Sequence, residues 1–200
     1  MKKFIYLIAL TLFSSSVLAE GFYVGGGYLK SHTDIYKKET LDWHKRDDKN
    51  DGFTLFAGYD LNKRFAIEAG YNDLGITDIQ GTMTGAGDIR GIFEISVMTL
   101  AGVIKTDPIA ENLVIFAKAG FARNDLHETV SGLTNTILSA DKTNTFYGIG
   151  ADYELVNGLA VRALYESYGK DDGLDDVNDT RVVPARSDPT VFSISLIKRF

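Results

Sequence analysis

The chain ends in T-V-F-S-I-S-L-I-K-R-F, residues 190–200, and this stretch decides the fold. Its side chains alternate between two faces, because successive residues of a strand point to opposite sides of a sheet. One face carries Phe192, Ile194, Leu196, Lys198 and Phe200, and the other carries Val191, Ser193, Ser195, Ile197 and Arg199. We therefore predict a strand with one mostly apolar and one largely polar face, which ends at an aromatic residue.

Seven earlier segments repeat this alternation, while helical periodicity is scarce. They are residues 21–31, 52–59, 64–72, 91–105, 113–123, 143–154 and 159–168. The connections between them alternate in length. Long polar connections cover residues 32–51, 73–90, 124–142 and 169–188, and short ones cover residues 60–63, 106–112 and 156–158. This order predicts an all-β fold, an eight-stranded antiparallel up-and-down transmembrane β-barrel with both termini at the end of the short turns.

The first nineteen residues have the three-part pattern of a secretory signal peptide. Lys2 and Lys3 are basic, residues 4–13 are apolar, and the small-residue run 14–19 ends in V-L-A. The apolar run is only about half of the roughly 20 residues that a membrane-spanning helix needs, which argues against an uncleaved anchor. We predict cleavage between Ala19 and Glu20, and one barrel domain over residues 20–200.

Charge and cysteine content narrow the class of protein. The formal net charge is −6, and the loss of Lys2 and Lys3 changes it to −8. Such a chain is a poor partner for nucleic acid, because phosphate binding needs a basic patch. The sequence has no cysteine, which excludes disulfides and cysteine-based metal sites. After residue 19 no apolar run approaches the length of a transmembrane helix, so a mature protein in a membrane would cross it as strands.

A membrane barrel and a soluble barrel differ in which face of the strands is apolar. The interior of an eight-stranded barrel has room only for packed side chains, and the large apolar set of this chain would overfill it. We therefore predict that the apolar faces contact lipid and that the polar faces line the lumen. In residues 91–105 this scheme places Glu94, Met98 and Leu100 inward. Aromatic residues at the membrane interfaces are predicted to be Tyr59, Tyr71, Phe121, Tyr153 and Tyr168.

Seven charged residues fall on the predicted inward faces. They are Arg64, Glu68, Glu94, Lys118, Asp152, Arg162 and Glu166. Buried charges must be paired and hydrogen-bonded, so we predict a structural network of salt bridges that plugs the lumen. The alternative is a gated pore of low conductance, but eight strands leave no open channel.

The residues that could carry chemistry are few. His32, His44 and His127 lie in predicted loops or at their edges. Acyl-transfer catalysis needs a serine, a histidine and an acid on one face, whereas adjacent Ser31 and His32 would point to opposite faces of a strand. The acidic run 47–52 fails as a calcium loop because Lys49 occupies a ligand position, and the aspartates of residues 171–179 are interpreted as a solvated loop. We predict no enzyme, no metal site and no cofactor.

Several motifs together resemble a known family. They are G-F-Y-V-G-G-G-Y at 21–28, G-F-T-L-F-A-G-Y-D at 52–60, F-A-I-E-A-G-Y at 65–71 and the terminal K-R-F at 198–200. In this ordered set the chain resembles the OmpA-like and OmpX-like small outer-membrane β-barrels of Gram-negative bacteria. The resemblance implies periplasmic termini, long loops outside the cell, and insertion by the barrel assembly machinery, which would read Phe200 as an assembly signal.

The expected function is a structural or surface-interaction role in the outer membrane, carried by four long extracellular loops. A lipid A-modifying enzyme and a low-conductance pore are the alternatives. The expected partners are outer-membrane lipid and lipopolysaccharide, the assembly machinery during biogenesis, and a host or surface ligand at the loops.

Overall fold

The structure, a computed structural model, describes residues 21–35, 42–46, 49–83, 87–131, 136–169 and 187–200. The predicted cleavage between Ala19 and Glu20 lies outside the described residues. No helix in these segments is long and apolar enough to cross a membrane.

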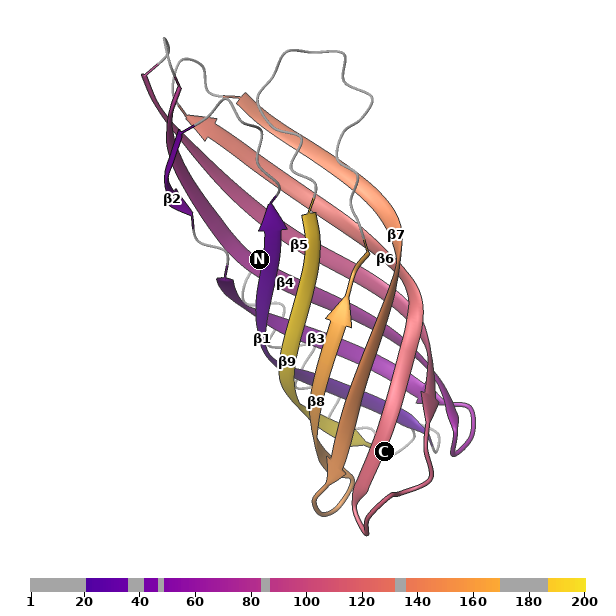
Figure 1. The fold of residues 1–200 in the computed structure, drawn as a ribbon. Helices are drawn as coiled ribbons and strands as arrows, with labels where there is room; N and C mark the ends of the chain where they lie inside the picture. Colours follow the sequence, from indigo (N-terminus) through magenta and orange to yellow (C-terminus); the bar gives the residue numbers. More distant parts are fainter. Residues whose placement is uncertain (1–20, 36–41, 47–48, 84–86, 132–135, 170–186) are drawn as a thin grey trace, which may run out of the picture.

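In the described segments, nine antiparallel strands make up one sheet, and eight of them close into a barrel (Figure 1). The strands are β1 (Phe22–Ile35), β2 (Asp42–Arg46), β3 (Lys49–Asp60), β4 (Phe65–Met83), β5 (Gly87–Lys105), β6 (Leu113–Ser131), β7 (Thr136–Glu154), β8 (Leu159–Ser167) and β9 (Ser187–Arg199). The short β2 stands outside the closed set and pairs with the far part of β4. The predicted eight-stranded barrel is confirmed, with β2 as an addition.

The barrel closes where its first and last strands meet. β1 pairs with β9 from Tyr23↔Arg199 to Ile35↔Ser187. Beyond this ladder, the Phe200 N–H donates to the Phe22 carbonyl at 3.0 Å, and the centroids of their rings lie 6.1 Å apart. Closure of this seam removes the free sheet edges that would otherwise leave backbone groups unpaired in lipid.

The two ends of the barrel differ. At one end, which we call the terminal end, lie Phe22, Phe200 and the short connections 61–64, 106–112 and 155–158. The turn between β7 and β8 has positive φ at both Asn157 (55°) and Gly158 (72°), as a two-residue type I′ hairpin requires. We call the opposite end the loop end.

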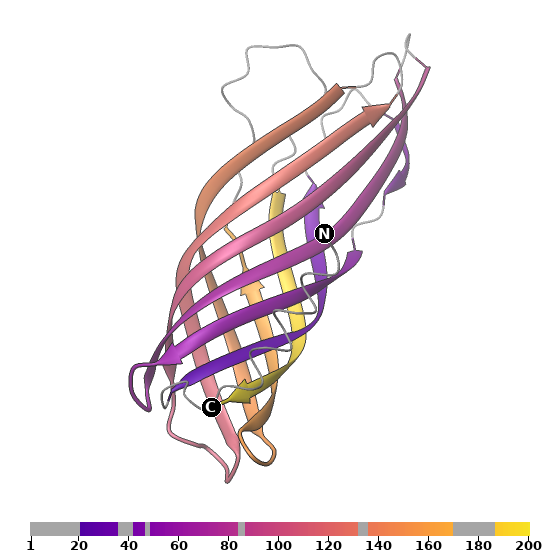
Figure 2. The same cartoon turned by 180° about the vertical axis from the view of Figure 1, so that it is seen from behind.

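Two of the predicted long loops are largely strand. β4 and β5 extend until only residues 84–86 separate them, and β6 and β7 until only residues 132–135 do. The prediction of loops at 73–90 and 124–142 was therefore wrong in extent. These stretches lack apolar alternation because they lie beyond the apolar outer surface, where backbone pairing alone defines a strand. The long strands β4–β7 form a wall that rises higher at the loop end than β1, β8 and β9 (Figure 1, Figure 2).

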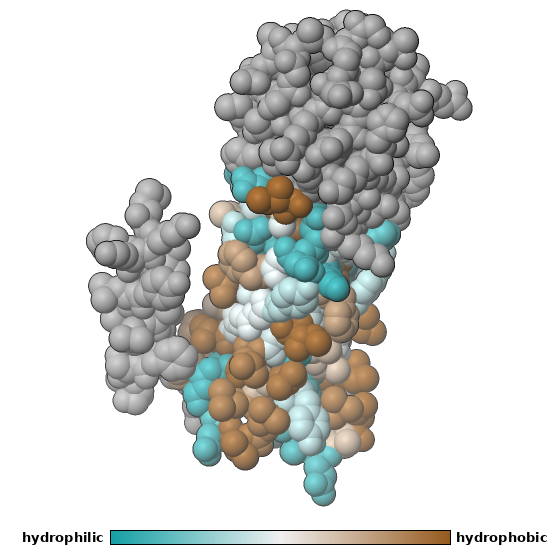
Figure 3. All heavy atoms as spheres, turned by 90° about the vertical axis from the view of Figure 1, so that its left-hand side faces the viewer, coloured by the Kyte–Doolittle hydropathy of each residue, from teal (hydrophilic) through white to brown (hydrophobic). Residues whose placement is uncertain are grey.

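The outer surface of the barrel is apolar. Side chains that are about half exposed on it include Leu55, Ile67, Leu100, Ile149 and Leu196. Figure 3 shows apolar side chains gathered on the lower part of the described surface, with hydrophilic ones above them toward the loop end. A soluble barrel would bury such residues, so this surface fits a lipid environment.

A ring of aromatic residues bounds this apolar surface at the loop end, and we call it the aromatic girdle. It comprises the last residue of each strand's outward apolar run, Tyr28, Phe53, Tyr71, Met98, Phe121, Tyr147, Tyr165 and Phe192. Only Met98 of β5 is not aromatic. The next outward residue on each strand is polar, namely Lys30, Asp51, Asp73, Ser96, Arg123, Thr145, Ser167 and Thr190. This sharp change predicts the boundary between lipid tails and headgroups.

The interior is packed with two apolar clusters. The one nearer the terminal end contains Tyr23, Phe56 and Phe116, and the one nearer the loop end contains Leu29, Phe146 and Tyr168. Tyr168 is fully buried and stacks on Phe146 with ring centroids 5.6 Å apart, so its prediction as an interfacial residue was wrong.

The faces of β5 are the reverse of those predicted. Val97 and Val103 are buried in the lumen, whereas Met98 and Leu100 are more than half exposed. This strand is apolar on both faces, because it supplies side chains both to the interior clusters and to the outer surface. Alternation alone therefore could not orient it.

Candidate functional site

The centre of the interior is an arginine held by two acids. Arg162 of β8 donates from Nε to Asp152 Oδ1 at 2.7 Å and from Nη2 to Asp152 Oδ2 at 3.0 Å. These two residues are register partners on β7 and β8. Arg162 Nη1 donates to Glu68 Oε2 of β4 at 2.6 Å. The bidentate pair joins the neighbouring strands β7 and β8, and the single bond to Glu68 crosses the lumen to β4, which is not a neighbour of β8 in the sheet.

A lysine extends this network toward the loop end. Lys118 Nζ on β6 lies 3.0 Å from Glu68 Oε1 and 2.8 Å from Glu166 Oε1. Glu68 therefore bridges Lys118 and Arg162, one with each carboxylate oxygen. All of these side chains are at most 5% exposed. Removal of any one member would take a partner from at least one buried opposite charge.

Aromatic rings enclose the arginine. The guanidinium carbon of Arg162 lies 4.3 Å from the ring centroid of Phe116, 4.8 Å from that of Phe56 and 5.8 Å from that of Tyr23. The Tyr23 hydroxyl donates to Glu68 Oε2 at 2.9 Å. Arginine suits this position because its planar group can stack on rings while its edge donates hydrogen bonds.

The network continues to the terminal end through the closing strand. Arg199 Nη2 lies 2.7 Å from Asp152 Oδ2 and its Nη1 lies 3.3 Å from Asp60 Oδ2. Lys105 Nζ binds the other oxygen of Asp60 at 2.5 Å. Asp60, Glu68, Asp152 and Glu166 thus face Lys105, Lys118, Arg162 and Arg199, so the formal charges of these eight groups cancel. We call this set the lumen network.

The structure brings together five of the seven charged residues predicted for the lumen. They are Glu68, Lys118, Asp152, Arg162 and Glu166. Arg64 lies outside the lumen. The strand that was predicted to begin at Arg64 begins at Phe65, and Arg64 belongs to the preceding turn. Its side chain is 64% exposed and pairs with Asp107 at 2.7 Å. Glu94 is also outside: it is exposed on the outer face, as the reversed faces of β5 require.

Sequence reasoning also missed three residues in or beside the lumen network: Tyr23, Asp60 and Lys105. Lys105 shares the parity of Val97 and Val103, so a correct orientation of β5 would have placed it inward. Tyr23 adjoins Phe22 on the opposite parity, and two adjacent aromatic residues leave the face of β1 ambiguous. Asp60 is the last residue of β3 and had been assigned to a turn.

The histidines and loop acids form no described site. His32 lies in β1 and His44 in β2, and His127 in β6 is the register partner of Glu94 and Ser139. Within the residues that the structure describes, no group of three His, Cys, Asp or Glu side chains could hold a metal ion. The aspartates of residues 171–179 lie outside the described residues.

A closed eight-stranded barrel with an apolar outer surface and a charged, packed interior defines a membrane-spanning β-barrel. Residues 18–200 match the OmpA-like transmembrane domain, and the chain belongs to this family of outer-membrane proteins. The predicted family membership and outer-membrane location are confirmed. No protein of curated function matches the sequence.

Solved structures of small outer-membrane barrels have the same fold. Ail, the attachment invasion locus protein of Yersinia pestis, is 18% identical with a TM-score of 0.56, over 91% of this chain and 100% of Ail. Neisserial surface protein A is 14% identical with a TM-score of 0.57, over 90% and 98% of the two chains. OprG of Pseudomonas aeruginosa is 12% identical with a TM-score of 0.59, over 90% and 96%.

Proposed function

We propose that this protein is a plugged outer-membrane barrel that presents its loop end to the cell exterior for surface interaction. The observation that carries the proposal is the lumen network, whose eight charged groups cancel and whose core is buried among aromatic rings. Such an interior favours a rigid support over a passage for solutes. Binding then belongs to the chain segments at the loop end, because binding residues concentrate on loops held by a rigid scaffold.

The orientation follows from the family resemblance. The termini of the barrel would lie in the periplasm. Outside the cell would lie the segments between β1 and β3, β4 and β5, β6 and β7, and β8 and β9. Lipopolysaccharide would surround the loop end, and the barrel assembly machinery would act on the terminal strand. Ail has been crystallised with the heparin analogue sucrose octasulfate, which supports ligand binding by a barrel of this kind.

Conductance measurements test the plug. The barrel in planar bilayers is expected to give no sustained current steps above the baseline. An Arg162→Ala, Glu68→Ala double variant, which removes two central members of the network, is expected to raise the frequency of current fluctuations. Stable open-channel steps in the unaltered protein would show that it acts as a pore.

Surface presentation is tested with an epitope tag inserted between Ser167 and Ser187, the ends of β8 and β9. Antibody is expected to label intact cells. A tag placed between Val156 and Asn157, in a terminal-end turn, is expected to require permeabilised cells. Labelling of the second tag alone on intact cells would reverse the orientation.

Surface interaction itself is tested by screening host matrix and surface molecules against the barrel in liposomes. Two shortened variants serve as comparisons: one replaces residues 170–186 with a Gly-Ser linker, and one cuts the β4–β5 hairpin back to the pair Asp73↔Ser96. Binding is expected to fall in at least one of them while the barrel stays folded. A lipid A mass spectrum that changes when the gene is deleted would instead support the enzymatic alternative.

A further inference from the structure

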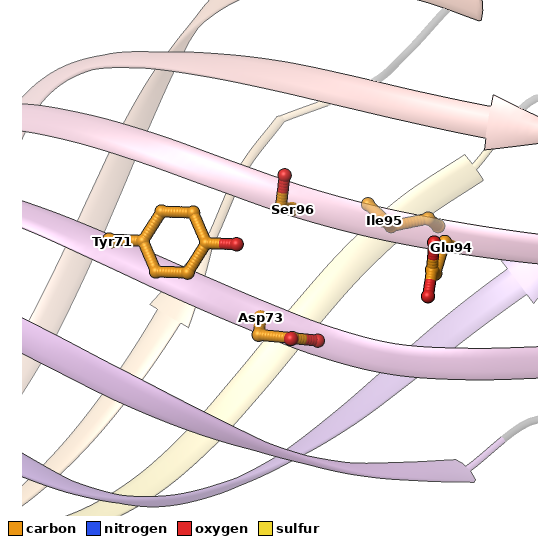
Figure 4. Close-up of a pocket in the computed structure, with 5 residues that line it drawn as sticks. All are labelled: Tyr71, Asp73, Glu94, Ile95 and Ser96. Carbon is orange, nitrogen blue, oxygen red and sulfur yellow. The ribbon is translucent and has the colours of Figure 1, made fainter. Parts of the chain in front are cut away.

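The apolar outer surface of the barrel ends differently at its two ends. At the loop end, carboxylates lie directly beyond the aromatic girdle. Figure 4 shows Asp73 and Glu94 beside a cavity between β4 and β5, next to the hydroxyl of Tyr71. The register of these two strands shifts here, between Asp73 and Ile76, which forms a β-bulge. Because a charged group is costly in hydrocarbon, these carboxylates mark the end of the lipid-facing surface.

At the terminal end, one connection continues the apolar surface instead. Residues 155–159 cover the turn between β7 and β8 and the first residue of β8, at the lower end of the barrel in Figure 1, and we call them the apolar hairpin. Leu155, Val156 and Leu159 are each more than 40% exposed. None of the five residues carries a charge. Exposed turns are usually rich in polar residues, so three exposed aliphatic side chains indicate contact with something other than water.

Two of these side chains extend the lipid-facing side of their strands. Tyr153 of β7 pairs with Val161 of β8 on the outer face, and the next outward pair is Leu155 with Leu159. The Leu155 N–H donates to the Leu159 carbonyl at 2.8 Å, which keeps this pair in register. One further pair adds about 5 Å to the apolar surface of these strands, at a tilt of about 40°. The apolar hairpin is therefore continuous with a surface that contacts lipid.

The backbone carbonyls at the tip of the apolar hairpin all have partners in the protein. The Val156 carbonyl accepts a hydrogen bond within the hairpin at 3.0 Å, and the Gly158 carbonyl accepts one from the Arg199 N–H at 2.7 Å. The Asn157 carbonyl accepts one from the Lys198 ammonium at 2.6 Å. A turn that enters hydrocarbon needs such partners, because no water is there to bond its carbonyls. The closing strand β9 supplies two of the three donors.

The opposite side of the terminal end is charged. In the closed ring of eight strands, the turn between β3 and β4 lies opposite the turn between β7 and β8. It contains Lys63 and Arg64, and Arg64 forms an exposed ion pair with Asp107 of the connection between β5 and β6. Leu61 and Ile109 are exposed in these two connections, but each lies among charged residues. Of the three short connections, only the apolar hairpin could enter lipid without taking charges with it.

We propose that the apolar hairpin inserts into the acyl chains of the leaflet at the terminal end, so that the side of β7 and β8 lies deeper in the membrane than the side of β3 and β4. Lipid is the occupant because the hairpin continues the lipid-facing surface and has its carbonyls bonded, neither of which a protein partner requires. Burial of three half-exposed aliphatic side chains favours the inserted position about 100-fold. This anchor goes beyond the proposed surface role and does not depend on which end of the barrel faces the cell exterior.

Nitroxide labels on single cysteines measure the depth of each position, because the chain has no other cysteine. The full-length barrel carries Val156→Cys, Lys63→Cys or, as the lipid-facing reference, Ile149→Cys, and is reconstituted in vesicles of 12-carbon phosphatidylcholine. Electron paramagnetic resonance compares the accessibility of each label to oxygen, which collects in lipid, and to a water-soluble nickel chelate. The two leucines that remain are expected to keep the nickel accessibility at residue 156 about tenfold below that at residue 63 and close to the reference.

Variants assign the insertion to the apolar side chains. In the Val156→Cys background, Leu155→Asn together with Leu159→Asn is expected to raise the nickel accessibility about tenfold, to the level at residue 63. Leu61→Asn in the Lys63→Cys background is the matched control, because it removes a similarly exposed leucine from the charged turn, and it is expected to change nothing. A heat-shifted gel band confirms that each variant is folded.

Three results would overturn the proposal. The first is equal nickel accessibility of the labels at residues 156 and 63. The second is a label at residue 156 that is shielded from both oxygen and the nickel chelate, as a contact with protein would produce. The third is shielding that disappears when the barrel is diluted in lipid, as a contact between copies would produce. An epitope tag in this hairpin is hydrophilic and would draw it out of lipid, so depth is measured only with single side chains.

Discussion

Arg162 shows how a single residue can hold a barrel together from inside. Its guanidinium bonds to Asp152 and Glu68 and lies against the rings of Phe56 and Phe116. The side chain is fully buried, so nothing but protein balances its charge. The same residue is thus both the electrostatic partner of two acids and a packing element between two rings.

Replacement of Arg162 by alanine is expected to lower the free energy of unfolding by about 3–5 kcal/mol, because the buried carboxylates of Glu68 and Asp152 each lose one of their two cationic partners. The measurement is the temperature at which the folded band on a gel converts to the unfolded band. Arg64→Ala is the control: its pair with Asp107 is exposed, so its loss is expected to cost less than about 1 kcal/mol. Equal shifts in the two variants would contradict the role of the lumen network.

Gly25 provides a second test at this scale. A Cβ atom at Gly25 would lie 2.3 Å from the Phe56 ring, which covers Arg162, whereas a Cβ atom at Gly102 would meet nothing within 4 Å. We expect Gly25→Ala to destabilise the barrel by about 1–3 kcal/mol through displacement of that ring. Gly102→Ala is expected to be neutral or slightly stabilising. Urea unfolding in detergent micelles measures both, and equal stability of the two variants would show that the ring moves freely.

At the level of whole strands, sequence reasoning succeeded where one face contacts lipid and the other contacts the lumen. β3 and β4 alternate cleanly, and their outward residues, such as Leu55 and Ile67, are exposed as predicted. It failed on β5, because the lumen holds apolar clusters and needs Val97 and Val103 inside.

The prediction of the lumen network also succeeded only on strands whose two faces could be told apart from the sequence. Glu68, Lys118 and Arg162 were found because a charge on a strand with an apolar outer face must point inward. Glu94 was misplaced together with the face of β5, and Arg64 was misplaced because the end of a strand cannot be read to one residue. The bulge at Asp73 was also out of reach, since a register shift depends on the neighbouring strand.

The closing strand carries a prediction of its own. Deletion of Phe200 is expected to reduce the amount of folded protein in the outer membrane, because the assembly machinery is expected to read a terminal aromatic residue. Quantitative immunoblots of membrane fractions measure this amount. Phe200→Tyr, which keeps an aromatic terminus, should restore it.

A second variant separates recognition from stability. Phe22→Ala removes the ring that packs on Phe200 but keeps the terminal residue. If Phe200 acts only through this contact, both changes will lower the amount of folded protein equally. If it acts as an assembly signal, the deletion will have the larger effect.

For the molecule as a whole, the height of the apolar outer surface determines which membrane thickness the barrel fits. The outward apolar run of β4 extends from Phe65 to Tyr71, and the other strands have runs of similar length. Seven residues at a tilt of about 40° span about 15 Å between their end Cα atoms, and side chains bring the band toward about 25 Å. This height is below the roughly 30 Å of a typical bilayer core.

We therefore expect unassisted folding to be more efficient in vesicles of 10- or 12-carbon lipids than in vesicles of 18-carbon lipids, because mismatch costs free energy for each ångström. The folded fraction on unheated gels measures this. A triple variant, Thr145→Leu, Ser167→Leu and Thr190→Leu, extends the apolar run on three neighbouring strands and is expected to narrow the difference. No change in the triple variant would mean that the girdle does not set the boundary.

The pairing of β1 with β9 also has a consequence for the folding of the barrel. Tyr23 and Arg199 lie near opposite ends of the described sequence, so this pairing closes a very long loop. Its closure costs about 3 kcal/mol more chain entropy than closure of a four-residue turn. The ion pair between Asp152 and Arg199 can form only after this closure, because Arg199 lies on β9. Until β9 pairs with β1, the sheet is open and Asp152 lacks Arg199, so the charges of the lumen network balance only when this last strand is in place.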